Sequence, residues 1–293
     1  MVECAQRRWR TAEGLDLVGD EGGNRTAPTV VLMHGGGQTR HSWSGTMRTL
    51  VGQGYHVINY DARGHGDSDW SESGAYHLDD RVVDLRAILQ DRHGDFALVG
   101  ASMGGATAIH AIASGLKAAA VVLVDIVPEP EPEGIARIVN FMRAHTNGFA
   151  SLDEAVDAVA AYNPSRPRPS DPSGLMRNLR ERGGRLYWHW DPRTIAGRDE
   201  VGRPEAAEDS FHNLLLRSAA VAARQTEVPL LLVRGLSSDV VSDAGVAAFR
   251  ALAPRLEVVD VGGAGHMVAG DRNDVFGKGV IEFLGRHMPP GGH

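Results

Sequence analysis

Three residues of the types needed for nucleophilic catalysis each follow a predicted strand of this chain. Ser102 lies in the stretch Gly100-Ala101-Ser102-Met103-Gly104, directly after the apolar run 96–99. Asp239 and His266 follow two later apolar runs. A serine hydroxyl becomes a good nucleophile when an imidazole takes its proton and a carboxylate holds that imidazole in place. The spacing therefore predicts Ser102 as nucleophile, His266 as base and Asp239 as acid.

The glycines around Ser102 are typical of a tight turn between a strand and a helix. Such a turn places the serine at a strained backbone angle, and Gly100 and Gly104 leave room for the neighbouring elements. The backbone N–H groups that follow point to where negative charge develops during attack on a carbonyl. We expect Met103 and Gly36 to supply two such N–H groups as an oxyanion hole, each worth on the order of 3 kcal/mol of barrier.

Gly36 belongs to a second glycine-rich loop, His34-Gly35-Gly36-Gly37, which follows a buried run at 29–33. Neither a G-x-x-x-x-G-K-S/T pattern nor a G-x-G-x-x-G pattern is present here, so a phosphate cradle is not indicated. The remaining interpretation is a loop that presents N–H groups to an oxyanion. His34 either takes part in catalysis or holds this loop by hydrogen bonds, and we favour the second role.

The identity of the acid has three candidates. Asp239 is preferred because it lies in the loop directly after the strand predicted at 229–235. Asp125 also ends a predicted strand, where it could otherwise serve as a hinge or bond to a helix, and Asp243 lies slightly farther along. The open edge of a parallel sheet collects all such strand ends, so the pattern alone leaves Asp125 and Asp243 as alternatives.

A charged turn after the strand at 56–60 contains Asp61, His65 and Asp67. Two carboxylates and an imidazole in seven residues are compatible with a metal site. A structural loop held by Asp61 and Arg63 is the interpretation we favour, so we assign no metal ligand.

Strands that alternate with helices predict a mostly parallel, doubly wound α/β sheet. This alternation stops at Pro128, and residues 128–225 contain helical patterns near 133–143, 151–161, 173–182 and 206–223 but no long buried strand. Trp188 and Trp190 lie within that segment and predict either a small separate core or a pocket wall. Trp43, in the helix expected at 42–50, is a third candidate for the pocket.

The composition excludes several classes of protein. The chain has 293 residues, a net charge of −7 and 42% hydrophobic residues, which argues against a nucleic-acid or anionic-membrane partner. Its one cysteine, Cys4, cannot form an intramolecular disulfide. No signal-peptide pattern or membrane-length apolar run is visible. We expect a cytoplasmic protein, monomeric or homodimeric.

These motifs together resemble those of the α/β-hydrolase superfamily over nearly the whole chain. The matching stretches are His34-Gly35-Gly36, Asp61-Ala62-Arg63-Gly64-His65-Gly66-Asp67-Ser68, Gly100-Ala101-Ser102-Met103-Gly104-Gly105, Asp239 and Gly265-His266. The resemblance implies an eight-stranded sheet with helices on both faces, a helical cap inserted after the sixth strand, and no cofactor. We accordingly expect a core domain of residues 1–127 and 226–293 and a cap of residues 128–225.

Differences from known relatives narrow the expected reaction. Epoxide hydrolases and dehalogenases carry an aspartate where this chain has Ser102. The carbon–carbon hydrolases of aromatic degradation share the triple glycine, but usually have asparagine before the nucleophile and tryptophan after the histidine; this chain has Ala101 and Met267. We expect a serine hydrolase that cleaves a small-molecule carboxylic ester. A lactonase, a carbon–carbon hydrolase, a perhydrolase or haloperoxidase-like enzyme and a non-catalytic receptor remain alternatives.

Overall fold

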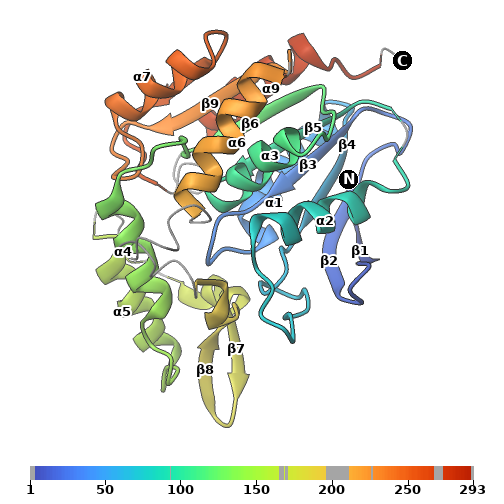
Figure 1. Ribbon diagram of the computed structural model, residues 1–293. Coiled ribbons are helices and arrows are strands. Elements are labelled where there is room, and N and C mark those ends of the chain that lie inside the picture. Colours follow the sequence, from blue (N-terminus) through green and yellow to red (C-terminus); the bar gives the residue numbers. More distant parts are fainter. Residues whose placement is uncertain are drawn as a thin grey trace.

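The computed structural model describes residues 4–92, 94–164, 168, 171–195, 211–225, 227–266 and 273–291. Its main element is an eight-stranded sheet in the order β1-β2-β4-β3-β5-β6-β9-β10 (Figure 1). The two pairings made by β2 are antiparallel and all the others in this sheet are parallel. The strands are β1 (Cys4–Arg10), β2 (Asp16–Gly22), β3 (Thr29–Met33), β4 (His56–Tyr60), β5 (Phe96–Ala101), β6 (Ala120–Val124), β9 (Leu230–Gly235) and β10 (Glu257–Val261). The predicted α/β-hydrolase sheet is confirmed.

Helices cover both faces of this sheet because its central strands are apolar on both sides. Val31 of β3 points into one core cluster, while Val30 and Leu32 point into the other. Helices α2, α3, α6 and α7 pack on the first face, and α1 and α9 pack on the second. Their bounds are α1 (Ser44–Gly52), α2 (Leu78–Leu89), α3 (Met103–Ala113), α6 (Phe211–Gln225), α7 (Asp243–Leu252) and α9 (Asn273–His287). Each helix among the described residues is too short or too polar to span a membrane.

The segment after β6 forms a separate layer, drawn at the lower left of Figure 1. It has its own cluster of buried residues, which includes Phe149 and Trp188. Its elements are α4 (Pro132–Arg143), α5 (Leu152–Tyr162), two 3₁₀ helices (Pro172–Asn178 and Pro192–Ile195), and the strands β7 (Leu179–Arg182) and β8 (Arg185–Trp188). The hydroxyl of Ser151 caps α5 by accepting a hydrogen bond from the Glu154 N–H.

Two expectations about this cap segment are wrong. The helix predicted at 173–182 is a 3₁₀ helix followed by β7, which pairs with β8 across a Gly183–Gly184 turn whose residues both have positive φ. In addition, α6 packs against α3 and contributes Leu215 and Ala219 to the core beside the sheet. By its packing, α6 therefore belongs with the sheet, although its residues fall within the predicted cap.

The charged turn after β4 is held by a buried ion pair. The Arg63 guanidinium donates two hydrogen bonds of 2.7 Å to the Asp84 carboxylate of α2, and neither side chain is more than 2% exposed. Burial raises the pKa of Asp84, although Arg63 opposes that shift. Removing one partner of such a pair leaves an uncompensated buried charge.

We therefore predict that Arg63→Met lowers the free energy of unfolding by about 3–5 kcal/mol, measured by urea denaturation. Arg10→Met is the matched control, because Arg10 also pairs with a carboxylate, that of Asp16, but at the surface. Its urea midpoint should equal that of the wild type. Equal midpoints for both variants would show that the buried pair does not stabilise the fold.

Candidate active site

Ser102 sits at a strained turn between β5 and α3. Its backbone has φ +45° and ψ −109°, a region that residues other than glycine rarely adopt. A Cβ atom on Gly100 would lie 2.3 Å from the Gly104 carbonyl carbon, and one on Gly104 would lie 2.4 Å from the Met33 carbonyl oxygen. Glycine is therefore required at both positions. The sequence pattern predicted the same reason, namely the lack of room for a side chain.

His266 is paired with a buried carboxylate, that of Asp125. Asp125 directly follows β6, has φ +50°, and is fully buried. The distance from His266 Nδ1 to Asp125 Oδ2 is 2.6 Å. The same carboxylate accepts hydrogen bonds from the Ser238 hydroxyl at 2.6 Å and from the Gly235 N–H at 3.1 Å. Three donors, two from the end of β9 and its following loop and one from the loop after β10, therefore fix its orientation.

The expectation that Asp239 orients His266 is wrong in this structure. The Asp239 carboxylate instead forms an ion pair of 2.7 Å with Arg137 of α4, and both side chains are more than one third exposed. Asp243, the third candidate, pairs with Arg234 at 2.6 Å. The loop after β9 still contributes to the site, but through Ser238, whose hydroxyl donates a hydrogen bond to Asp125.

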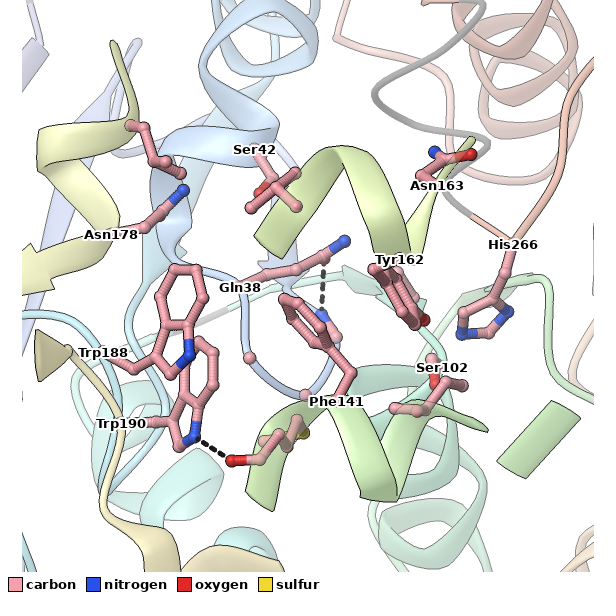
Figure 2. Close-up of a pocket in the computed structure, with 18 of the residues that line it drawn as sticks. Gln38, Ser42, Ser102, Phe141, Tyr162, Asn163, Asn178, Trp188, Trp190 and His266 are labelled. Carbon is pink, nitrogen blue, oxygen red and sulfur yellow. Dashed lines mark hydrogen bonds between the residues drawn. The ribbon is translucent and has the colours of Figure 1, made fainter. Parts of the chain in front are cut away.

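The carboxylate at Nδ1 leaves the opposite nitrogen of the imidazole able to accept a proton. When Nδ1 donates to Asp125, Nε2 is the basic nitrogen of the neutral ring. Ser102 and His266 line the same cavity, of about 450 Å³. Figure 2 shows them side by side at one end of that cavity, with the tryptophans at the other end. This arrangement suits proton transfer from the serine hydroxyl.

The two expected oxyanion donors, Gly36 and Met103, line the cavity beside Ser102. Met103 is the first residue of α3, so its N–H has no acceptor within the helix. His34 holds the loop that contains Gly36, because its Nδ1–H donates a hydrogen bond of 2.8 Å to the Gly35 carbonyl. The Nε2 atom of His34 accepts from the Ala62 N–H at 2.9 Å. The interpretation of His34 as a residue that holds this loop is confirmed.

Two further buried imidazoles, those of His65 and His189, adjoin His34. Ring centroids are 5.2 Å apart for His34 and His65, and 5.9 Å apart for His65 and His189. Burial lowers the pKa of all three rings, that of His65 well below its usual range and that of His189 to about 3. All three are therefore neutral near pH 7.

The structure does not bring Asp61, His65 and Asp67 together as metal ligands. Both carboxylates bind the Arg40 guanidinium. His65 accepts from the Gly37 N–H and donates to the Arg63 carbonyl, so both of its ring nitrogens are occupied by backbone groups. Across the part of the chain that the structure describes, no group of three His, Cys, Asp or Glu side chains is placed to hold a metal ion.

The far wall of the cavity is aromatic and comes from the cap. Trp188 and Trp190 both line it, stacked with centroids 4.9 Å apart and planes 12° apart. Nearer Ser102, Phe141 of α4 stacks on Tyr162 of α5 with ring centroids 4.2 Å apart (Figure 2). These two tryptophans therefore serve in both of the predicted ways, since Trp188 and Trp190 also belong to the cap's own buried cluster.

Trp43, the third tryptophan expected in the pocket, is not there. It is fully buried in the core on the α1 and α9 face of the sheet. Its neighbour Ser42 lines the cavity instead. The segment begins with the short 3₁₀ helix Arg40–Trp43, so the side-chain directions differ from those of the α-helix that the sequence suggested.

Ser238 and His189 are not among the residues predicted from the sequence. Ser238 is adjacent in the sequence to Asp239, the acid favoured from the spacing. Its position just after a strand indicates that its hydroxyl could donate a hydrogen bond to a carboxylate at the same sheet edge. His189 stands between two tryptophans on a buried segment, and a polar ring in such a place needs hydrogen-bond partners.

Comparison with known proteins identifies the family. Residues 30–277 match a family model described as "Alpha/beta hydrolase family". The chain is 30% identical over 261 residues to "Esterase Rv0045c" of Mycobacterium tuberculosis, covering 84% of this chain and 79% of that protein. A crystal structure of "E-2-(Acetamidomethylene)succinate Hydrolase" superposes with a TM-score of 0.81 at 24% identity, covering 96% of this chain and 99% of that one.

A "Probable protein phosphatase methylesterase 1" of Caenorhabditis elegans is 31% identical over 173 residues. That match spans 54% of this chain and 46% of the methylesterase. The chain thus matches less than half the length of this relative.

We predict that Asp125→Asn slows labelling of Ser102 by a fluorophosphonate probe by roughly 10³- to 10⁴-fold, because an amide no longer fixes the required tautomer of His266. Asp239→Asn is the matched control and should label at the wild-type rate. Labelling is followed by mass spectrometry of the Ser102 peptide. The reverse pattern would return the role of the acid to Asp239.

We also predict that the protein loses stability as the pH falls from 7 to 5. Burial lowers the folded-state pKa values of His65 and His189. Below about pH 6.5 these two histidines therefore bind protons in the unfolded chain but stay neutral in the folded protein. Each ring should cost about 2 kcal/mol of unfolding free energy at pH 5. Urea denaturation at both pH values measures the loss, and His189→Asn should reduce it by about 2 kcal/mol, the contribution of one ring. A loss identical in that variant would contradict the buried, neutral state of His189.

Proposed function

The chain belongs to the alpha/beta hydrolase family, and from that premise we propose that it is a serine hydrolase that cleaves uncharged carboxylic esters through an acyl-enzyme. The observation that carries the proposal is the pairing of His266 with the buried Asp125 carboxylate, at the end of the cavity where Ser102 lies. Esterases among its relatives support the same class of reaction.

In the proposed reaction, the Ser102 hydroxyl oxygen attacks the ester carbonyl carbon while Nε2 of His266 takes the hydroxyl proton. Asp125 stabilises the imidazolium that forms. Negative charge on the former carbonyl oxygen is received by the N–H groups of Gly36 and Met103. The bond between the carbonyl carbon and the alcohol oxygen then breaks, and His266 donates its proton to that leaving oxygen. Water then repeats the sequence on the acyl-enzyme and releases the acid.

The lining of the cavity supports an apolar, uncharged substrate. Phe141, Tyr162 and Trp188 give the part of the wall formed by the cap an aromatic surface. Arg168 also lines the cavity, but its guanidinium is paired with the carboxylates of Asp153 and Asp157. A dicarboxylate, such as the succinate in the name of the structural neighbour, would meet no uncompensated positive charge from Arg168. We therefore propose an ester whose acyl group is an aliphatic chain or an aromatic ring.

We predict turnover of p-nitrophenyl esters, with an optimum at an acyl chain longer than acetate because the cavity wall formed by the cap is apolar. Ser102→Ala should lower kcat by on the order of 10⁴- to 10⁶-fold. Absorbance at the p-nitrophenolate band, across a series from acetate to decanoate, provides the measurement.

Ser114→Ala is the matched control, because Ser114 is exposed and lies at the opposite end of the same helix. It should retain wild-type turnover. Activity that persists in Ser102→Ala would refute the serine mechanism. A folded wild-type protein that is inactive on the whole series would instead favour a lactone, a carbon–carbon bond or a receptor role.

A further inference from the structure

The cap forms a hydrogen bond to the glycine loop 34–37 through the side chain of His189. Its neighbours Trp188 and Trp190 face the cavity, whereas His189 is 1% exposed and contacts the core. The Gly66 N–H donates to Nδ1 of His189 at 2.7 Å, and Nε2 lies 3.4 Å from the Gly37 carbonyl oxygen. Because Nδ1 accepts, the proton of the neutral ring is on Nε2 and is donated to Gly37.

Gly37 is therefore held by two imidazoles from different parts of the chain. His65 of the core accepts from its N–H at 3.2 Å, and His189 of the cap donates to its carbonyl. On the other side of Gly36, the Gly35 carbonyl accepts from His34. Gly36, the candidate oxyanion donor, thus lies between two residues whose backbone is fixed by histidines.

The segment that bears His189 is itself anchored to the core. The Asp191 N–H donates to the Gly64 carbonyl at 2.8 Å, and the Tyr76 hydroxyl donates to the Asp191 carboxylate at 2.6 Å. Arg193 donates to the Ser71 carbonyl at 2.8 Å. These contacts give His189 a fixed base, so that its bond to Gly37 can set the position of the loop.

We propose that His189 is a positioning residue, which uses the cap to hold the Gly36 N–H in place for the oxyanion. The inference rests on the proposed function, since it assumes that the oxyanion forms at Gly36. It also links two parts of the site. The segment that provides the aromatic wall for the substrate fixes the donor for the reacting oxygen, so the cap acts in the chemical step as well as in binding.

The test compares His189→Asn, His189→Gln and the wild type. In His189→Asn the amide oxygen can replace Nδ1 as acceptor for Gly66, but the side chain is too short to reach Gly37. We expect kcat on the best ester to fall by about 10- to 100-fold with little change in KM. The fall should be smaller than that caused by removing an oxyanion donor entirely, because the Gly36 N–H is displaced and not deleted. The longer amide of His189→Gln can reach Gly37 and should restore part of kcat.

Affinity for a trifluoromethyl ketone separates positioning from a general structural defect. Such a ketone forms an oxyanion adduct with the serine, so its affinity should fall about as much as kcat in His189→Asn. His56→Asn is the matched control: His56 is also fully buried and bonded, to Glu21 at 2.9 Å, but belongs to strand β4 and does not line the cavity. It should keep wild-type kcat and ketone affinity.

Amide hydrogen exchange of the peptide that contains residues 35–37 provides a readout independent of activity. Exchange should be faster in His189→Asn than in the wild type and His56→Asn. Unchanged exchange, unchanged ketone affinity, or a rise in KM at constant kcat would each overturn the proposal. If the wild type hydrolyses no ester, the proposed function fails, and exchange of this peptide still decides whether His189 holds the loop.

Discussion

The site depends on how one buried carboxylate is satisfied. Asp125 has no access to solvent, and burying such a group without partners would cost several kcal/mol. The hydrogen bonds from His266, Ser238 and the Gly235 N–H compensate this cost. Because Gly235 and Ser238 lie at and just after the end of β9 and His266 follows β10, the carboxylate fixes the base relative to the sheet.

Buried hydrogen bonds also hold the glycine loop 34–37 in place. The backbone groups of Gly35 and Gly37 bond to imidazoles that burial keeps neutral. A neutral imidazole offers one donor and one acceptor, so it can satisfy two backbone groups without adding charge near the oxyanion. Charged side chains, such as Arg40 and Asp61, are paired with each other at the edge of this region.

The fold could be predicted from the sequence because its signals are local. Apolar runs separated by helical patterns gave the parallel sheet, and the glycines around Ser102 gave the turn that carries the nucleophile. The hairpin β7–β8 was not predictable in the same way. Its strands are short and carry charged residues such as Arg180 and Arg182, a composition that resembles the exposed face of a helix.

The choice between Asp125 and Asp239 depended on side-chain direction, which the spacing does not contain. Both residues follow parallel strands, and both were candidates for that reason. Asp125, at a backbone position with positive φ, binds His266. Asp239 instead pairs with Arg137, a residue of the cap that lies about a hundred positions away in the sequence. Trp43 shows the same limit: its place in the core follows from how the chain enters α1.

The most direct test of the catalytic arrangement is to trap the acyl-enzyme. The wild-type protein would be mixed with p-nitrophenyl butyrate, quenched with acid within milliseconds, digested and analysed by mass spectrometry. The arrangement of Ser102, His266 and Asp125 predicts a butyryl group on the peptide that contains Ser102, formed together with a burst of p-nitrophenolate. Hydrolysis of the ester with Ser102 unmodified at every quench time, and with no burst, would contradict it.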